Sequence, residues 1–184
     1  MKTLIALLCL LSSINAFADS FFTPTTAPVN TYAVNPANTQ QQIGAKFSAS
    51  APGFVYGLRW WKTTGETGNH AVALLSTAGA LLASNSLTEG ETASGWQVAM
   101  FTTPYLIAAD TDYYIVRHSN GQSLSYTANV AAIDINNMHL YAGSFYQNTT
   151  STTTFVPNAN ASGYFVDVMY VPKSRTFILI PNDQ

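Results

Sequence analysis

Apolar and polar residues alternate over many short stretches of this chain, with the period of two that is typical of half-buried β-strands. Ile43, Ala45 and Phe47 begin the pattern and predict a first strand. Further strands are predicted over residues 54–62, 70–76, 81–87, 96–101, 112–118, 124–128 and 164–171. No sustained 3.6-residue apolar period follows residue 18, so helices are not expected. Short strands separated by Gly and Pro turns predict an all-β fold, an antiparallel β-sandwich of the jelly-roll or immunoglobulin-like kind.

Turn-forming residues between these stretches predict how the strands are connected. Residues 77–80 are few enough to join two neighbouring strands as a hairpin. Pro104 is expected to end the strand that begins at Trp96, because proline cannot donate a hydrogen bond to a neighbouring strand. Residues 131–162 show no clear period and are predicted to form a long surface loop.

The first eighteen residues have the three parts of a secretory signal peptide. Lys2 gives the positive start, residues 4–11 form an apolar run, and Ala16–Ala18 provide small residues at the expected cleavage site. The apolar run is shorter than the roughly 18 residues that a membrane-spanning helix needs. A lipoprotein anchored at Cys9 is the alternative, although the residue before this cysteine is bulky. We therefore expect residues 1–18 to be a signal peptide and the product to be secreted or periplasmic, with no membrane span.

The remaining residues suit one domain with two flanking segments. Residues 19–42 are rich in Thr, Pro, Asn and Gln and are predicted to form an extended N-terminal arm, with one short edge strand at 31–34. Residues 43–172 are predicted to form the β-sandwich domain. Residues 173–184 form a C-terminal tail with the short apolar run Phe177–Ile180, which could close the sheet of its own chain or add to an edge of a partner.

Charge and cysteine content argue against several classes of function. Charged residues make up 9% of the chain and the formal net charge is −2, so no basic patch for nucleic acid is expected. The single cysteine lies in the predicted signal peptide. Disulfides, a cysteine nucleophile and Cys-ligated zinc are therefore not expected in the secreted product.

The other residue types that carry chemistry lack the spacing that catalysis or metal binding requires. The three histidines show no HExxH or comparable metal spacing, and no GxSxG motif positions a serine nucleophile. Paired carboxylates can hydrolyse glycosides, but Glu89 with Glu91 and Asp110 with Asp112 both lie in predicted polar turns. The second pair could help bind calcium, yet the full calcium-loop pattern is missing. We predict no enzyme activity, no cofactor and no metal.

Eight short motifs follow one another in a characteristic order. They are IGAKF at 43–47, GLRWWK at 57–62, TGNH at 67–70, STAGALLA at 76–83, ETASGWQ at 91–97, FTTP at 101–104, YYIVRH at 113–118 and YFVDV at 164–168. In this order and spacing the chain resembles the bacterial family called domain of unknown function 4082. The resemblance implies a β-sandwich accessory module of secreted bacterial proteins, with a binding or spacer role and no established activity. Gln42 departs from the family pattern, in which an acidic residue is expected.

A tryptophan next to an arginine on one strand face carries the functional hypothesis. Strict alternation over 54–62 predicts one face with Phe54, Tyr56, Leu58 and Trp60, and an opposite face with Val55, Gly57, Arg59 and Trp61. An exposed tryptophan beside an arginine can stack on a sugar ring and hydrogen-bond to its hydroxyl groups. We therefore predict a glycan-binding site at Arg59 and Trp61, with Tyr114 and His118 as neighbours.

The predicted function is a secreted, non-enzymatic β-sandwich that binds a polysaccharide or another cell-surface glycan. The alternative is a structural or adhesion component that acts through a protein partner or through self-association, which the tail 173–184 suggests. At the level of the site, residues 131–162 could instead cover Trp61 and turn this face into a second core. Trp96, at the start of a strand, is expected to be a core residue.

Overall fold

The computed structural model describes residues 18–33, 41–87, 90–119, 123–148, 159–160 and 162–174. These residues form strands joined by turns, and no helix occurs among them, which confirms the predicted all-β class. The strands are β1 (Asn30–Ala33), β2 (Gln41–Ala49), β3 (Gly53–Lys62), β4 (His70–Ser76), β5 (Leu81–Leu87), β6 (Gly95–Ile107), β7 (Tyr113–Ser119), β8 (Ser123–Tyr126), β9 (Ile133–Ile135), β10 (Met138–Leu140), β11 (Ser144–Asn148), β12 (Ala159–Asn160) and β13 (Val166–Pro172).

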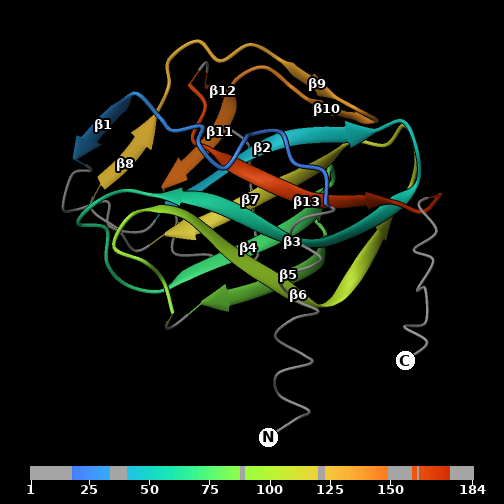
Figure 1. The fold of residues 1–184 in the computed structure, drawn as a ribbon, viewed down its shortest axis with the longest axis horizontal. Coiled ribbons are helices and arrows are strands. Elements are labelled where there is room, and N and C mark those ends of the chain that lie inside the picture. Colours follow the sequence, from blue (N-terminus) through green and yellow to red (C-terminus); the bar gives the residue numbers. More distant parts are fainter. Residues whose placement is uncertain are drawn as a thin grey trace, which may run out of the picture.

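The strands build an antiparallel β-sandwich (Figure 1). The larger sheet has the strand order β12-β11-β2-β7-β4-β5, and β10 with its partner β9 shares one edge of β2 with β11. The smaller sheet has the order β13-β3-β6, so β3 is its central strand. A separate antiparallel pair, β1 with β8, lies at one end of the molecule.

The two sheets enclose one main hydrophobic core. The larger sheet contributes residues such as Phe47 and Ile115, and the smaller sheet contributes Leu58, Trp60 and Tyr170, all of them fully buried. Burying a side chain of this kind stabilises the fold by about 1.5–3 kcal/mol. The alternation of the strands therefore supplies the core, as expected for a sandwich whose inner faces interdigitate.

Strand β3 departs from the strict alternation that its sequence predicts. Its inward residues are Val55, Leu58 and Trp60, and its outward residues are Phe54, Tyr56, Arg59 and Trp61. The pairing register shifts between Val55 and Gly57, so that Tyr56 is an extra residue that reverses the alternation. Glycine is needed at this bulge, because a Cβ on Gly57 would collide with the carbonyl oxygen of Ala99. The prediction that Phe54 and Tyr56 share a face with Leu58 and Trp60 is wrong.

Strand β6 continues through Pro104, which was predicted to end it. Residues 101–104 lie between the paired residues Met100 and Tyr105 and fall outside the register with β3. Because β6 is also the edge strand of its sheet, the missing N–H of proline removes no hydrogen bond to a neighbour there. The bulge in β3 and the unpaired residues of β6 that include Pro104 therefore lie opposite each other, and together they form one irregularity in the pairing of the two strands.

The long surface loop predicted over 131–162 is wrong for the part that the structure describes. Strands β9 and β10 form a hairpin in which Met138 pairs with Ile135 across a tight turn. Asn136 in this turn has a φ of 52°, the left-handed conformation that such hairpin turns require. Strand β11 extends the larger sheet and pairs with β12. Residues 149–158 lie outside the described residues.

The N-terminal arm packs as an integral part of the sandwich. Asp19 forms two backbone hydrogen bonds with Tyr170 of β13, of 2.7 and 3.0 Å. Phe21 enters the main core and contacts Phe47 edge to face. The short strand predicted at 31–34 is observed as β1. In Figure 1 the arm, in blue, runs from its contact with β13 to β1.

Two other predicted segments lie outside the described residues. They are the signal peptide, of which Ala18 alone is described, and the apolar run Phe177–Ile180 in the tail. Within the described ranges, no helix is long and apolar enough to cross a membrane.

Candidate functional site

Two tryptophans meet on the outer face of the smaller sheet. Trp61 of β3 is the direct cross-strand partner of Trp96 of β6, and their rings pack edge to face with centroids 5.9 Å apart. Side chains directly opposite each other in an antiparallel pair lie on the same face, so the register itself creates this contact. Both side chains are half-buried. Trp96, which was expected in the core, therefore belongs to the outer face.

Phe165, just before β13, joins the two tryptophans in a strained backbone conformation. Its φ is 56°, in the left-handed region that bulky residues rarely adopt. Its ring lies 6.2 Å from that of Trp96, and its carbonyl oxygen accepts a 3.0 Å hydrogen bond from the backbone N–H of Trp61. Such strain persists where surrounding contacts enforce it, and it gathers at functional sites.

The N-terminal arm covers one side of these rings. Phe22 stacks on Phe165 and on Trp96, with centroid separations of 4.7 and 5.8 Å. The indole N–H of Trp96 donates a hydrogen bond of 2.9 Å to the carbonyl oxygen of Thr26. The arm therefore covers Trp96 and Phe165. We call Phe22, Trp61, Trp96 and Phe165 the outer aromatic cluster.

A buried ion pair fixes the arm to the sheet beside this cluster. The guanidinium of Arg59 lies 4.5 Å from the ring centroid of Trp96 and pairs with Asp167 at 2.6 Å. Arg59 also donates a hydrogen bond to the carbonyl oxygen of Phe22. Asp167 is fully buried and accepts hydrogen bonds of 2.9 and 3.1 Å from the backbone N–H groups of Phe21 and Phe22. Arg59, predicted to contact a ligand, is thus engaged in holding the arm.

Burial raises the pKa of Asp167, while Arg59 and the backbone amides of the arm act in the opposite direction. Burial has this effect because it withdraws the charged carboxylate from water. Loss of the arm would remove two hydrogen-bond donors from a carboxylate that water cannot reach. The arm is therefore bound by electrostatics as well as by its aromatic side chain.

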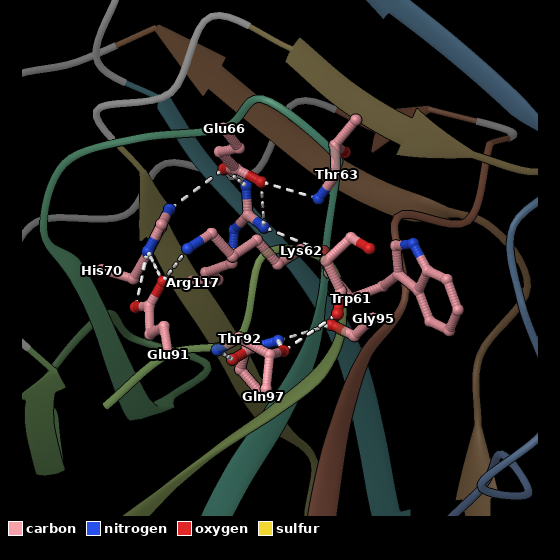
Figure 2. Close-up of polar contacts among 11 residues, drawn as sticks. Trp61, Lys62, Thr63, Glu66, His70, Glu91, Thr92, Gly95, Gln97 and Arg117 are labelled. Carbon is pink, nitrogen blue, oxygen red and sulfur yellow. Dashed lines mark hydrogen bonds and ion pairs between the residues drawn. The ribbon is translucent and has the colours of Figure 1, made fainter. Parts of the chain in front are cut away.

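A second polar group lies inside the sandwich at the same end of β3 (Figure 2). We call it the His70 cluster, and its members are Lys62, Glu66, His70, Glu91 and Arg117. Glu66 forms an ion pair with Arg117 and contacts Nε2 of His70 at 3.2 Å. Glu91 contacts Nδ1 of His70 at 2.7 Å and Nζ of Lys62 at 2.8 Å. Glu66 and His70 are fully buried, and Arg117 is 1% exposed.

The contacts of His70 determine the proton content of the cluster. Both ring nitrogens face carboxylate oxygens, and ionised carboxylates only accept hydrogen bonds. The two contacts therefore need two N–H groups on the imidazole, or a proton on one of the two carboxyl groups. Because His70 is fully buried and both of its ring nitrogens contact carboxylates, its role in this cluster is structural.

The His70 cluster holds the chain segment that carries Trp61, and a neighbouring polar group holds the segment of Trp96. Arg117 Nη1 donates a 3.1 Å hydrogen bond to the carbonyl oxygen of Trp61. On the β6 side, the side-chain amide of Gln97 donates hydrogen bonds to the Thr92 hydroxyl and to the Gly95 carbonyl oxygen. Figure 2 shows the indole of Trp61 directed away from the charged cluster. The inner charges thus fix its backbone while its ring lies on the other face of the sheet.

The structure does not bring Tyr114 and His118 to the face of Trp61. Both residues are on β7, in the larger sheet, and they lie on the outer face of that sheet. Tyr114 packs against a separate small apolar cluster there, and His118 is buried. Of the four residues predicted to bind a ligand, Arg59 and Trp61 are neighbours, and the other two lie in the opposite layer.

The residues of the two predicted carboxylate pairs differ in their surroundings. Asp112 pairs with Lys46 at 3.1 Å and accepts a 2.8 Å hydrogen bond from the hydroxyl group of Tyr141. Asp110 is exposed in a turn, with a φ of 51°. Glu89 lies outside the described residues. In the part of the chain that the structure describes, no group of three or more His, Cys, Asp or Glu side chains is placed to hold a metal ion.

A family model described as a domain of unknown function (DUF4082) matches residues 25–166. The chain belongs to the DUF4082 family. This confirms the family that the sequence motifs suggest. The DUF4082 match includes Trp61, Trp96 and Phe165, and it ends one residue before Asp167.

No curated protein matches the DUF4082 chain. Among solved structures, the clostridial cysteine protease Cwp84 after propeptide cleavage has a similar fold, with a TM-score of 0.50 and 10% sequence identity. The similarity covers 85% of the DUF4082 chain and 41% of the protease chain, so this chain spans less than half the length of that neighbour. At this identity the likeness concerns the β-sandwich fold alone.

Sequence reasoning overlooked Phe22 and Asp167, two of the residues that attach the arm. Their contact joins positions 145 residues apart, and no local spacing announces it. A signal did exist for Trp96, because pairing the strands over 54–62 and 96–101 as antiparallel neighbours can place it opposite Trp61. An acidic residue inside an otherwise apolar strand, as in 164–168, is the other clue, since a buried carboxylate needs a partner.

Proposed function

We propose that this chain is a secreted, non-enzymatic module that binds a polysaccharide or a cell-surface glycan through Trp61 and Trp96. The observation that carries the proposal is the pair of half-buried indole rings on the outer face of the smaller sheet. An indole offers a flat apolar surface to the C–H face of a sugar ring, and it is rigid enough to bind with little loss of entropy. The proposed contact residue is Trp61, and Trp96 supports it from the side.

Preorganisation of the two rings supports a binding role. Trp96 is fixed by its hydrogen bond to Thr26 and by the guanidinium of Arg59. The backbone of Trp61 is held on both sides, by Phe165 and by Arg117. A surface that is rigid before the ligand arrives avoids the cost of ordering side chains on binding. The strained backbone of Phe165 fits the same interpretation.

The engagement of the acidic side chains supports a non-enzymatic role. A glycoside hydrolase needs two carboxyl groups facing one substrate, one of them free to donate a proton. Glu66 and Glu91 are bound by His70 and by cations, and Asp167 is bound by Arg59 and the arm. Each of these carboxylates is therefore engaged in holding the fold.

Secretion is supported by the signal-peptide pattern in residues 1–18. A single β-sandwich of this size, held by its hydrophobic core without disulfides, is a stable unit for an extracellular module.

Binding of the protein starting at Asp19 to a glycan array tests the proposal. Trp61→Ala should weaken binding about 30-fold, the effect expected for losing a central aromatic contact of about 2 kcal/mol. Tyr56→Ala is the matched control, because Tyr56 is also a half-buried outward aromatic of β3 but lies at the bulge, away from Trp61 and Trp96. Absence of any glycan ligand, or equal binding by the Trp61→Ala protein, would show that the assignment is wrong.

A structural or adhesion role through protein contacts is a second candidate, favoured by the edge strand β6. This strand exposes Val98 and Leu106, at 38% and 46% of their surface, and exposed apolar residues on an edge strand can pair with another chain. Size-exclusion chromatography of the intact protein, of a Val98→Lys/Leu106→Lys variant and of a chain lacking 173–184 tests this role. Concentration-dependent association that either change abolishes would favour it, and a monomer in every case would refute it.

A further inference from the structure

The charges around the outer aromatic cluster decide which class of glycan it can take, if the proposed function holds. The two cations next to the tryptophans are Arg59 and Lys62, and both are neutralised within the protein. Arg59 pairs with Asp167 at 2.6 Å, and Lys62 pairs with Glu91 at 2.8 Å. The side chains of both cations are 12% exposed, so a carboxylate or sulfate in solution has little access to either.

The same pairing extends to the other cations that the structure describes. Lys46 pairs with Asp112, and Arg117 pairs with Glu66. Within the described ranges, Lys173 is the cation without an ion pair, and it follows β13 next to Pro52. That position is at the opposite end of β3 from Trp61, about 25 Å away at a rise of about 3.3 Å per residue. A polyanion bound at the tryptophans would therefore find no described counter-charge beside it.

An anionic ligand would also meet an unfavourable field. The formal net charge of the chain is −2, which repels polyanions at long range. A ligand carboxylate placed against the indole rings would lose water without gaining a cation, and this desolvation is costly. The cluster therefore selects against charge on the ligand.

The segments that flank the tryptophans carry hydroxyl groups that suit an uncharged ligand. Thr64 lies three residues after Trp61, Ser94 lies two residues before Trp96, and both are exposed. On the arm, Thr25 is exposed next to the residue that accepts the hydrogen bond of the Trp96 indole. A hydroxyl group both donates and accepts hydrogen bonds, as do the hydroxyl groups of a sugar.

We propose that the outer aromatic cluster binds an uncharged polysaccharide, with a sugar ring stacked on Trp61 and its hydroxyl groups bonded to the threonine and serine rim. This inference rests on the proposed glycan-binding function and adds the ligand class. It also predicts how binding responds to salt. Stacking and neutral hydrogen bonds are insensitive to ionic strength, whereas ion pairing at an exposed site weakens as the Debye length falls.

Affinity electrophoresis with matched neutral and anionic polymers tests the ligand class. The gels contain a panel of neutral glucans, mannans, xylans and galactans, with hydroxyethyl cellulose set against carboxymethyl cellulose and dextran against dextran sulfate. Each is run at about 20 mM and about 500 mM NaCl. We expect at least one neutral polymer to retard the protein equally at both salt concentrations, and Trp61→Ala to abolish the retardation. Thr64→Lys should add binding to the anionic polymers at low salt only.

The outcomes separate this inference from the proposed function. Retardation by anionic polymers alone, or retardation that disappears at high salt in the unmodified protein, would overturn the neutral-ligand inference and leave glycan binding intact. Failure of every polymer to retard the protein would refute the proposed function and this inference together. Thr64→Lys is the positive control, because it shows that the gel detects charge-driven binding when a free cation is present.

Discussion

Two buried arginine–carboxylate pairs lie on opposite faces of the same end of β3, and they connect different parts of the chain. Arg117 and Glu66 lie inside the sandwich, where Glu66 belongs to the loop that directly follows β3. Arg59 and Asp167 lie on the outer face, where they hold the N-terminal arm. Both carboxylates are fully buried, yet the first pair joins a strand to a neighbouring loop and the second joins a sheet to a distant segment.

The difference teaches where a binding surface can arise in a small β-sandwich. The His70 cluster satisfies its own charges, and its most buried members, His70 and Glu66, are inaccessible to solvent. The outer aromatic cluster is covered by the arm on one side and leaves Trp61 and Trp96 partly open. Ion pairing thus builds the fold in both places, but only the outer face retains a surface for a ligand.

Breaking the inner pair should have the largest effect on stability. Glu66→Gln leaves the Arg117 guanidinium buried without a counter-charge, which typically costs about 3–5 kcal/mol. Urea unfolding monitored by tryptophan fluorescence measures the free energy of unfolding. Glu91→Gln is the matched control and should cost less, because Glu91 and its partner Lys62 are 9% and 12% exposed, whereas Glu66 and Arg117 are 0% and 1% exposed. Equal costs for the two variants would contradict the distinction.

Breaking the outer pair should release the arm with a smaller loss of stability. Asp167→Asn weakens the acceptor for Arg59 and for two arm amides but keeps a carbonyl oxygen there, and the Arg59 side chain is 12% exposed, so the expected cost is about 1.5–3 kcal/mol in total. Limited proteolysis followed by mass spectrometry should show faster cleavage within residues 19–33. The Glu66→Gln protein, under conditions in which it is folded, provides the comparison. If its arm is cleaved equally fast, the ion pair of Asp167 is not what holds the arm.

The pH dependence of the outer pair has a definite sign. Because burial raises the pKa of Asp167, its contribution to stability is fully present below the ordinary aspartate value of 3.8 and is lost as the pH rises through the raised value. Asp167→Asn should therefore destabilise the protein more at acid pH than at neutral pH. Urea unfolding of both proteins across this range measures the difference. A destabilisation that grows with pH would mean that Arg59 and the arm amides outweigh burial and lower the pKa.

The ion pair between Lys46 and Asp112 should contribute less to the free energy of unfolding than the two buried pairs. Their side chains are 26% and 34% exposed, so water screens the interaction. Lys46→Met should change the free energy of unfolding by no more than about 1 kcal/mol, as is usual for surface ion pairs. A cost that approaches that of Glu66→Gln would show that burial does not rank the ion pairs of this protein.

The sequence predicted the positions of the strands more accurately than the direction in which their side chains point. Periodicity located β2, β3, β4, β5, β7 and β13, because each buries one side or both against the other sheet. It could not locate the bulge at Tyr56, since a register shift depends on both neighbouring strands. Strands β9 and β10 were missed because each is three residues long, too short for a period to be recognised.

The candidate site was predicted in part, for reasons of distance along the chain. Trp61 was placed on the outer face correctly, because alternation within half a strand is a local property. The engagement of Arg59 could not be foreseen, since its partner Asp167 is 108 residues away. The grouping of Arg59 with Tyr114 and His118 is wrong, because β3 and β7 belong to different sheets.

The most direct test of the account is a titration of the three indole N–H signals in a nitrogen-15 NMR spectrum with a neutral polysaccharide that the protein binds. The chain has three tryptophans, and Trp60, which is fully buried, serves as the internal reference. We predict that the signals of Trp61 and Trp96 shift with saturation while that of Trp60 stays in place. Saturable binding without a shift of the Trp61 signal would contradict the assignment of the outer aromatic cluster as the ligand site.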